Sequence, residues 1–174
     1  MAKKILVLGL GNTILTDDGV GIYAARELRK MIDYPNVSIM EASLAGLQLL
    51  DLVAGYDTMI LIDSIKLPGG KIGEIYRIEA EALRSTVRLA SIHDINFATA
   101  MEFGRLMGLQ IPSEIEIFAV CVADTETFGE KCTPAVEMAV PKAARILLER
   151  LREHLEGKKT AKLGKSQGGK WRRS

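Results

Sequence analysis

The sequence predicts an α/β protein, a three-layer α/β/α domain with a mostly parallel central sheet of about five strands. Short apolar runs rich in branched residues recur along the chain, which is typical of strands buried on both faces. Segments with helical spacing of apolar residues separate these runs. The first run also ends in a glycine-rich turn and a helix start, which together make the first half of a βαβ unit.

Size and composition favour one soluble domain. The chain has 174 residues, 48% of them apolar, which is enough to bury a substantial core. No apolar run approaches membrane-spanning length, and the first residues lack the pattern of a cleavable signal. The two cysteines, Cys121 and Cys132, lack Cys-x-x-Cys spacing and fit a reducing compartment. We therefore expect a cytoplasmic protein in which residues 1–155 form a single domain.

The first strand is expected at Ile5–Leu8, closed by the glycine-rich turn at residues 9–12. Thr16 or Asp17 can then accept hydrogen bonds from the free N–H groups of a helix that runs from Val20 to about Ile32. Ligands of open α/β sheets bind at the carboxyl ends of such strands, so this turn is the first candidate for a site.

The remaining elements follow the same alternation. Strands are expected at Val37–Glu41, Thr58–Ile62, Lys71–Glu79 and Glu114–Val122, the third of these at an edge of the sheet. Helices are expected at residues 44–53, 95–106 and 133–151, the last with Thr133 as its N-cap. The polar loop 123–132 either forms a wall of a groove or only connects two elements.

The end of the chain differs in composition from the rest. Residues 156–174 contain seven of the 23 basic residues and few residues that could be buried. We expect this segment to be a disordered basic tail, attached to a domain in which acidic residues outnumber basic ones.

The Gly9-x-Gly11 turn suggests a nucleotide site, but its surroundings favour a cation. A dinucleotide fingerprint needs a third glycine three residues later, where this chain has Ile14. Asp17 and Asp18 would also repel a phosphate placed at the start of the helix. A nucleotide-binding module therefore remains an alternative that these two acids weaken.

Three side chains from separate segments could form a metal site. Asp63 ends an apolar strand and would adjoin the turn that carries Asp18 if the first and third strands are neighbours. His93 lies at or just before a helix start, and with the two aspartates it completes an O, O, N set that suits a borderline divalent metal. The other histidine, His154, is read as an ordinary residue of the last helix.

Four motifs resemble the maturation endopeptidases of [NiFe] hydrogenases. They are Gly9–Gly21 (GLGNTILTDDGVG), Leu61–Asp63 (LID), Ser91–Asp94 (SIHD) and Thr133–Val136 (TPAV), in this order. The resemblance covers residues 3 to about 151. It departs from the family pattern where Asp18 replaces the glutamate of some members, and where Ala42 and Ser43 stand in place of the glycine and hydroxyl residue of many.

The resemblance implies an aspartic-type, nickel-dependent hydrolase. Asp18, Asp63 and His93 match the residues that contact nickel in that family, and we expect them to be both the metal-contacting and the catalytic residues. The side chains expected to contact the substrate are Asn12, Asp17 and Ser64.

The implied reaction removes the C-terminal peptide from a hydrogenase large-subunit precursor once nickel has been inserted. The enzyme would then hold no tightly bound cofactor, because nickel arrives with the substrate, and zinc or cadmium would replace nickel in vitro. The bound ion could polarise the scissile carbonyl or orient a water. We expect a monomer whose partner is this precursor, with no role for a membrane or for nucleic acid.

Two other enzyme readings remain open. Gly-Leu-Gly-Asn at a strand end also opens peptidyl-tRNA hydrolase, but that family continues with proline and a catalytic histidine. This chain has Thr13 there and no histidine before His93. Cys121 as a nucleophile with His93 as its base is a weaker option, because a cysteine inside an apolar strand is usually buried and inert.

Overall fold

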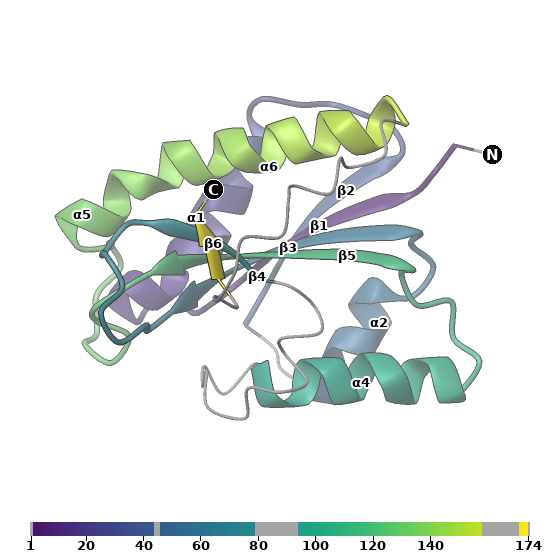
Figure 1. The fold of residues 1–174 in the computed structure, drawn as a ribbon, viewed down its shortest axis with the longest axis horizontal. Helices are drawn as coiled ribbons and strands as arrows, with labels where there is room; N and C mark the ends of the chain where they lie inside the picture. The colour runs from purple at the N-terminus through teal and green to yellow at the C-terminus, as the bar shows by residue number, and fades with distance from the viewer. Residues whose placement is uncertain (1, 44–45, 79–93, 158–170, 174) are drawn as a thin grey trace.

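Alternating strands and helices build a six-stranded sheet with helices on both faces (Figure 1). The computed structural model describes residues 2–43, 46–78, 94–157 and 171–173. The strands are β1 (Ile5–Leu10), β2 (Val37–Ala42), β3 (Thr58–Ile65), β4 (Ile75–Ile78), β5 (Glu114–Cys121) and β6 (Trp171–Arg173). The helices are η1 (Thr16–Gly19), α1 (Val20–Arg29), η2 (Gly46–Leu49), α2 (Leu50–Val53), α4 (Asp94–Leu106), α5 (Pro134–Glu137) and α6 (Ala139–Leu155).

The sheet has the order β2-β1-β3-β5-β4-β6 and is mostly parallel, as predicted. β1 pairs in parallel with both β2 and β3, and β3 pairs in parallel with β5. β4 is antiparallel to β5 and to β6. The predicted edge strand is therefore next to last in the sheet, because the short β6 covers its outer side.

Two helical layers explain why the central strands are apolar along their whole length. α1 and α6 cover one face of the sheet, and α2 and α4 cover the other (Figure 1). Along β1, Ile5 and Val7 pack toward α1 and α6, whereas Leu6 and Leu8 pack toward α2 and α4. Each of these four side chains is completely buried, so alternate residues of one strand contribute to two separate cores.

The strand β3 continues three residues beyond its predicted end. Its pairing with β5 runs through Asp63, Ser64 and Ile65, which lie opposite Ala119, Val120 and Cys121. The apolar pattern stops at Ile62, but ladder hydrogen bonds with a neighbouring strand do not require apolar side chains. Asp63 consequently lies inside a strand and has a fixed backbone.

The other boundaries differ in smaller ways. The helix expected at residues 44–53 is a 3₁₀ turn followed by the four residues of α2. The helix expected at residues 133–151 is divided into α5 and α6 at Met138, and α6 continues to Leu155.

The predicted cap of the first helix is wrong. Neither Thr16 nor Asp17 makes a capping hydrogen bond, because the 3₁₀ turn η1 precedes α1 and Gly19 is the residue before the helix. The polar atoms of Thr16 and Asp17 are instead bonded to the loop that follows β5. Backbone groups of that loop, one acceptor and one donor, thus bind these two side chains in place of the helix start.

Two glycines allow α1 and the first turn to approach the sheet closely. A Cβ on Gly21 would lie 2.3 Å from the Leu10 carbonyl oxygen and 2.4 Å from that of Ile62. Gly11 has a φ of 143°, and a Cβ there would lie 2.0 Å from the Asp18 carbonyl oxygen. These contacts hold η1 directly against the carboxyl ends of β1 and β3.

α6 ends at Leu155, directly before the predicted tail. Most of that tail, residues 158–170, lies outside the described residues, so its disorder stays a prediction. Trp171–Arg173 form β6, antiparallel to Tyr76–Ile78 of β4, which the composition of the tail does not predict. Backbone pairing of three residues does not need an apolar sequence, and this accounts for the difference.

Candidate active site

The carboxyl ends of three neighbouring strands bring the predicted acids together. η1 follows β1 and carries Asp17 and Asp18, while Asp63 and Ser64 belong to the end of the adjacent β3. The expectation that the first and third strands are neighbours is confirmed. The loop after β5 completes this edge of the sheet, at the left in Figure 1.

Ser64 connects the two predicted metal-contacting carboxylates. Its hydroxyl donates to Oδ1 of Asp18 at 2.9 Å, and its backbone N–H donates to Oδ1 of Asp63 at 2.8 Å. Asp18 is 8% exposed and Asp63 is 3% exposed. Ser64 thus links two buried carboxylates through its hydroxyl and its backbone N–H, and carboxylate oxygens of this kind suit a divalent cation.

Successive residues of β3 face opposite sides of the sheet, so the side chains of Asp63 and Ser64 lie on different faces. Ile60 and Ile62 pack toward α1 and α6, and Ser64, which shares their face, contacts Asp18 after β1. Leu61 and Ile65 pack toward α2 and α4, so Asp63 shares the face that α4 covers. Asp63 thus lies on the face of the sheet that is covered by α4, the helix that begins one residue after His93.

His93 itself lies outside the described residues, so the complete O, O, N set stays a prediction. Within residues 2–43, 46–78, 94–157 and 171–173, no three Asp, Glu, His or Cys side chains gather closely enough to hold a metal ion. The described side chains still fit the prediction, because the carboxylates of Asp18 and Asp63 can supply two oxygen ligands for a metal ion. The third ligand would come from His93.

Asp17 has a different environment from its neighbour. Its side chain is completely buried and accepts three hydrogen bonds from the loop after β5. The Thr133 N–H donates to Oδ1 at 2.6 Å, and Oδ2 accepts from the Thr133 hydroxyl at 3.1 Å and from the Asp124 N–H at 3.3 Å. These bonds give Asp17 a structural role. Its predicted contact with the substrate is untested, and this burial counts against it.

The other two predicted substrate-binding residues also bond within the chain. Oδ1 of Asn12 accepts a hydrogen bond from the Ile14 N–H at 3.2 Å, which shapes the turn after β1. Ser64 is 2% exposed and uses its hydroxyl for Asp18. Their contact with substrate stays a prediction.

The structure adds Thr16 and Thr133 to the site. Thr16 has a φ of 38°, which is unusual for a β-branched residue. Its hydroxyl donates to the Thr127 carbonyl at 2.6 Å. The sequence indicates Thr133 as a helix cap and as the first residue of the TPAV motif, but not that its N–H and hydroxyl both bond to Asp17. In the sequence, these contacts are indicated only by Asp17, because a helix start that already has Asp18 does not need a second acid for capping.

Neither cysteine has the environment of a nucleophile. Cys121 is completely buried in β5. Burial raises the pKa of the Cys132 thiol to about 12, and the nearby carboxylates of Asp17 and Glu137 contribute in the same direction. A thiol with such a pKa is protonated at neutral pH and unreactive.

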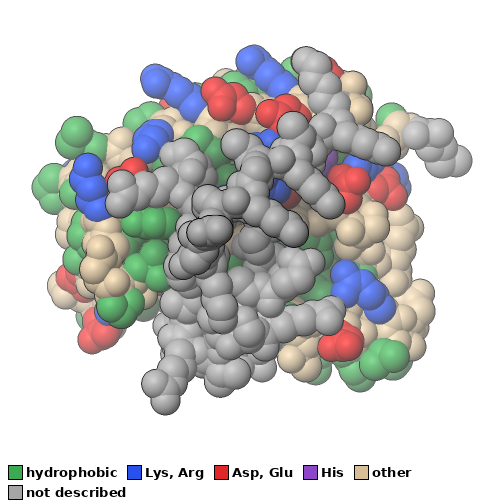
Figure 2. All heavy atoms as spheres, in the orientation of Figure 1, with side chains coloured by type: hydrophobic (Ala, Val, Ile, Leu, Met, Phe, Trp, Pro, Cys, Tyr) green, Lys and Arg blue, Asp and Glu red, His purple; other side chains and the backbone are tan. Residues whose placement is uncertain are grey.

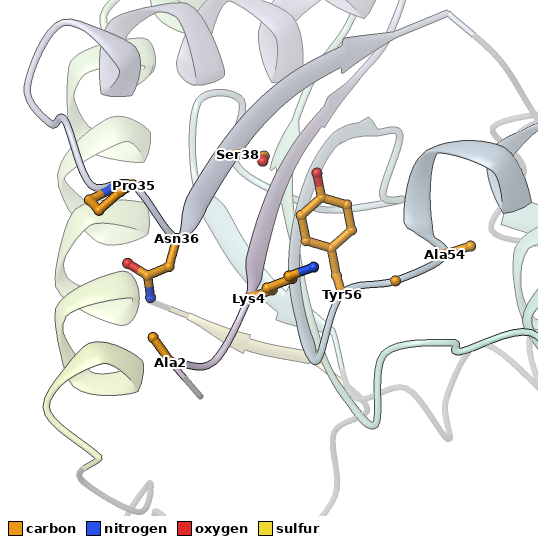
Figure 3. A pocket seen from close by; sticks show the side chains of 8 residues that line it. Ala2, Lys4, Pro35, Asn36, Ser38, Ala54 and Tyr56 are labelled. Carbon is orange, nitrogen blue, oxygen red and sulfur yellow. The ribbon is translucent and has the colours of Figure 1, made fainter.

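Two surface hollows lie away from the paired carboxylates. One, of about 440 Å³, is lined by Lys4, Ser38 and Tyr56 at the amino ends of β1 and β2, opposite the candidate site (Figure 3). The other, of about 500 Å³, lies between α1 and α6 and reaches Cys132. Across the part of the chain that the structure describes, no helix is long and apolar enough to span a membrane.

Comparison with known proteins identifies the family. Residues 22–150 match the family model HycI, described as hydrogenase maturation protease. The chain belongs to the hydrogenase maturation protease family. A member of this family is a hydrolase that processes a hydrogenase precursor, so the family decides against a peptidyl-tRNA hydrolase-like enzyme and against a nucleotide-binding module. The resemblance seen in the sequence motifs is confirmed.

Individual family members show the same relationship. The hydrogenase 2 maturation protease of Escherichia coli is 28% identical over 152 residues, which are 86% of this chain and 92% of that protein. The hydrogenase expression/formation protein HupD of Thiocapsa roseopersicina is 27% identical over 148 residues, which are 79% of this chain and 66% of HupD. The chain therefore spans about two thirds of the length of that HupD.

A solved structure supports the fold as well. The hydrogenase maturating endopeptidase HybD from E. coli superposes with a TM-score of 0.75 at 29% identity, over 87% of this chain and 93% of HybD. The α/β architecture with a mostly parallel central sheet is therefore the architecture of a maturation endopeptidase.

Proposed function

We propose that this member of the family is an endopeptidase that removes the C-terminal peptide from the large-subunit precursor of a [NiFe] hydrogenase after nickel insertion. The observation that carries the proposal is the pair of buried carboxylates, Asp18 and Asp63, joined through Ser64 at the carboxyl edge of the sheet. In a protease of hydrogenase maturation, such a pair is suited to sensing a metal ion on the substrate.

Nickel in this proposal is part of the substrate. Asp18 and Asp63 offer oxygen ligands, and His93 would add an imidazole nitrogen, a set that suits a borderline divalent ion. A precursor without nickel would offer Asp18 and Asp63 no ion to bind. The enzyme would therefore bind the loaded precursor better than the empty one, which explains why cleavage would follow metal insertion.

The chain's own residues would position the reacting groups. Ser64 fixes the orientation of Asp18 by donating a hydrogen bond, so the other oxygen of Asp18 can contact the nickel or a water molecule. A carboxylate that contacts a water near the scissile carbonyl can accept its proton as the water attacks. The nickel ion of the substrate would supply charge stabilisation, by polarising the carbonyl or by orienting that water.

The protein would act as a monomer without a metal of its own. An open ligand set without a fourth protein ligand favours weak binding, so purified protein should be largely metal-free and should bind nickel, zinc or cadmium only weakly. Elemental analysis before and after treatment with a chelator measures this. Stoichiometric zinc that survives the chelator would contradict substrate-borne nickel and favour an ordinary metallohydrolase.

The direct test is cleavage of the precursor. Purified protein is mixed with nickel-loaded large-subunit precursor, and mass spectrometry follows the loss of the C-terminal peptide. We expect one cut in the loaded precursor and none in the nickel-free precursor. If both precursors are cleaved equally well, the protein is still a maturation protease, but the proposal that it recognises nickel is wrong.

A further inference from the structure

Two loops at the carboxyl edge of the sheet are bonded into one unit. We call them the paired loops, residues 12–17 after β1 and residues 124–133 after β5. Leu15 and Gly129 form an isolated parallel bridge. The Gly129 N–H donates to the Ile14 carbonyl at 3.0 Å, and the Thr16 N–H donates to the Gly129 carbonyl at 2.9 Å.

Further contacts fix the conformation of the paired loops. The hydroxyl of Tyr23 on α1 donates to the Glu130 carbonyl at 2.8 Å. The Asp17 N–H donates to the Asp124 carbonyl at 3.0 Å, in addition to the three bonds that the Asp17 carboxylate accepts. The positive φ of Thr16 is an unfavourable conformation that such a bonded environment can maintain. The paired loops are therefore preorganised.

This preorganised unit holds two large apolar side chains in solvent. Phe128 is 81% exposed and Ile14 is 51% exposed, and each precedes a residue of the Leu15–Gly129 bridge. In Figure 2, hydrophobic side chains reach the surface at the left of this face, the end toward which the parallel strands point in Figure 1. Single exposed apolar residues are common on proteins, but here two are displayed by bonded loops, the first of which ends one residue before Asp18.

We propose that Phe128 and Ile14 form a docking surface for an apolar segment of the hydrogenase precursor beside its scissile bond. The inference rests on the proposed function, because it takes the precursor as the occupant. Continuity with the candidate site supports this occupant. Ile14 is four residues from Asp18, a distance of at most about 14 Å along an extended chain. A polypeptide bound at Asp18 and Asp63 is therefore within reach of the paired loops.

The chemistry of this surface determines which kinetic constant it affects. Aromatic and aliphatic side chains held in a fixed conformation bind a partner with little loss of conformational entropy. Neither Phe128 nor Ile14 has a group that transfers a proton or stabilises charge. The docking surface should therefore change KM for the precursor and leave kcat unchanged.

The test compares single substitutions in the full-length protein acting on nickel-loaded precursor. Phe128→Ser and Ile14→Ser should each raise KM roughly tenfold to a hundredfold, the loss expected when one large apolar contact is removed. Phe128→Leu, which keeps an apolar side chain, should retain most of the affinity. The matched control is Leu106→Ser at the end of α4, because Leu106 is also 81% exposed but lies toward the amino ends of the strands.

The outcomes separate this inference from the proposed function. If the wild-type protein cleaves the precursor and both serine variants keep its KM, the docking surface is wrong and the proposed function stands. A fall in kcat at constant KM, or an equal rise in KM for Leu106→Ser, also overturns the docking surface. If the wild-type protein does not cleave nickel-loaded precursor, the proposed function fails and this inference fails with it.

Discussion

At the scale of single residues, adjacent aspartates have different roles. Asp17 is completely buried and accepts three hydrogen bonds from Thr133 and Asp124. Asp18 accepts one from the hydroxyl of Ser64, whose backbone N–H donates to Asp63. The sequence indicates that both acids matter, because two acids follow the turn where one would suffice for a cap. It cannot show which of them bonds to a loop over a hundred residues away.

Substitutions at these two positions should separate stability from activity. Asp17→Asn places an amide where two donors from Thr133 and one from Asp124 now meet, and should lower the free energy of unfolding by about 1–3 kcal/mol. In Asp18→Asn the amide oxygen can still accept the hydrogen bond from the Ser64 hydroxyl, so stability should change by less than about 1 kcal/mol. Urea unfolding measures both, with the exposed Asp33→Asn as control. Equal losses at positions 17 and 18 would contradict these assignments.

Another buried carboxylate, Glu116 of β5, stabilises the packing of α6. Nε of Arg150 donates to Oε2 of Glu116 at 2.8 Å, and Nε2 of His154 lies 3.2 Å from Oε1. Arg77 of β4 lies 3.4 Å from the same oxygen. His154 thus has a structural partner, which agrees with its interpretation as an ordinary residue of the last helix.

The pH dependence of stability should report on Glu116. Burial alone would raise the pKa of Glu116, but hydrogen bonds from His154 and Arg150 outweigh this effect and lower the pKa from 4.5 to about 2. The charged form therefore stabilises the fold fully above pH 4.5, and this contribution is lost as the pH falls toward about 2. It amounts to roughly 3 kcal/mol at most.

The measurement is urea unfolding of the wild type and of Glu116→Gln at several pH values. The variant should be less stable at pH 7, and the difference should shrink as the pH is lowered from 4.5 toward 2. A difference that is constant over this range would show that the charge of Glu116 is not the cause.

At the scale of elements, the apolar pattern predicts which segments are strands and helices better than where they end. β3 continues past Ile62 because β5 pairs with it, and pairing partners far away in the sequence are not visible in one strand. The sequence of loop 123–132 is equally compatible with a wall of a groove and with a simple connection. In most of its bonds to residues 14–17 the loop contributes backbone atoms, which every residue has, so its own side-chain pattern gives little indication of them.

The tail tests the boundary of the domain. Deletion of residues 157–174 should leave the thermal midpoint nearly unchanged, because the segment has few apolar residues and its described part pairs with β4 through the three residues of β6. Calorimetry of the deletion variant beside the full chain checks this. A fall of several degrees would instead mean that β6 is an integral strand of the sheet.

At the scale of the whole molecule, the site exists because parallel strands end at one edge. Asp18 and Asp63 are 45 positions apart, and β1 and β3 bring them together through their pairing. The family's motifs indicated this pair and His93 from the sequence. The same topology adds the loop after β5, so the candidate catalytic acids and the proposed docking surface lie on one side of the protein.

Asp63 offers the most direct test of the central claim, that the paired carboxylates recognise nickel on the precursor. Asp63→Asn keeps the size of the side chain but weakens its metal ligation, so cleavage of nickel-loaded precursor should fall by about a hundredfold or more while the thermal midpoint stays close to that of the wild type. Asp33→Asn, in an exposed position, should cleave normally. Cleavage by Asp63→Asn at the wild-type rate would contradict the account and place the chemistry elsewhere.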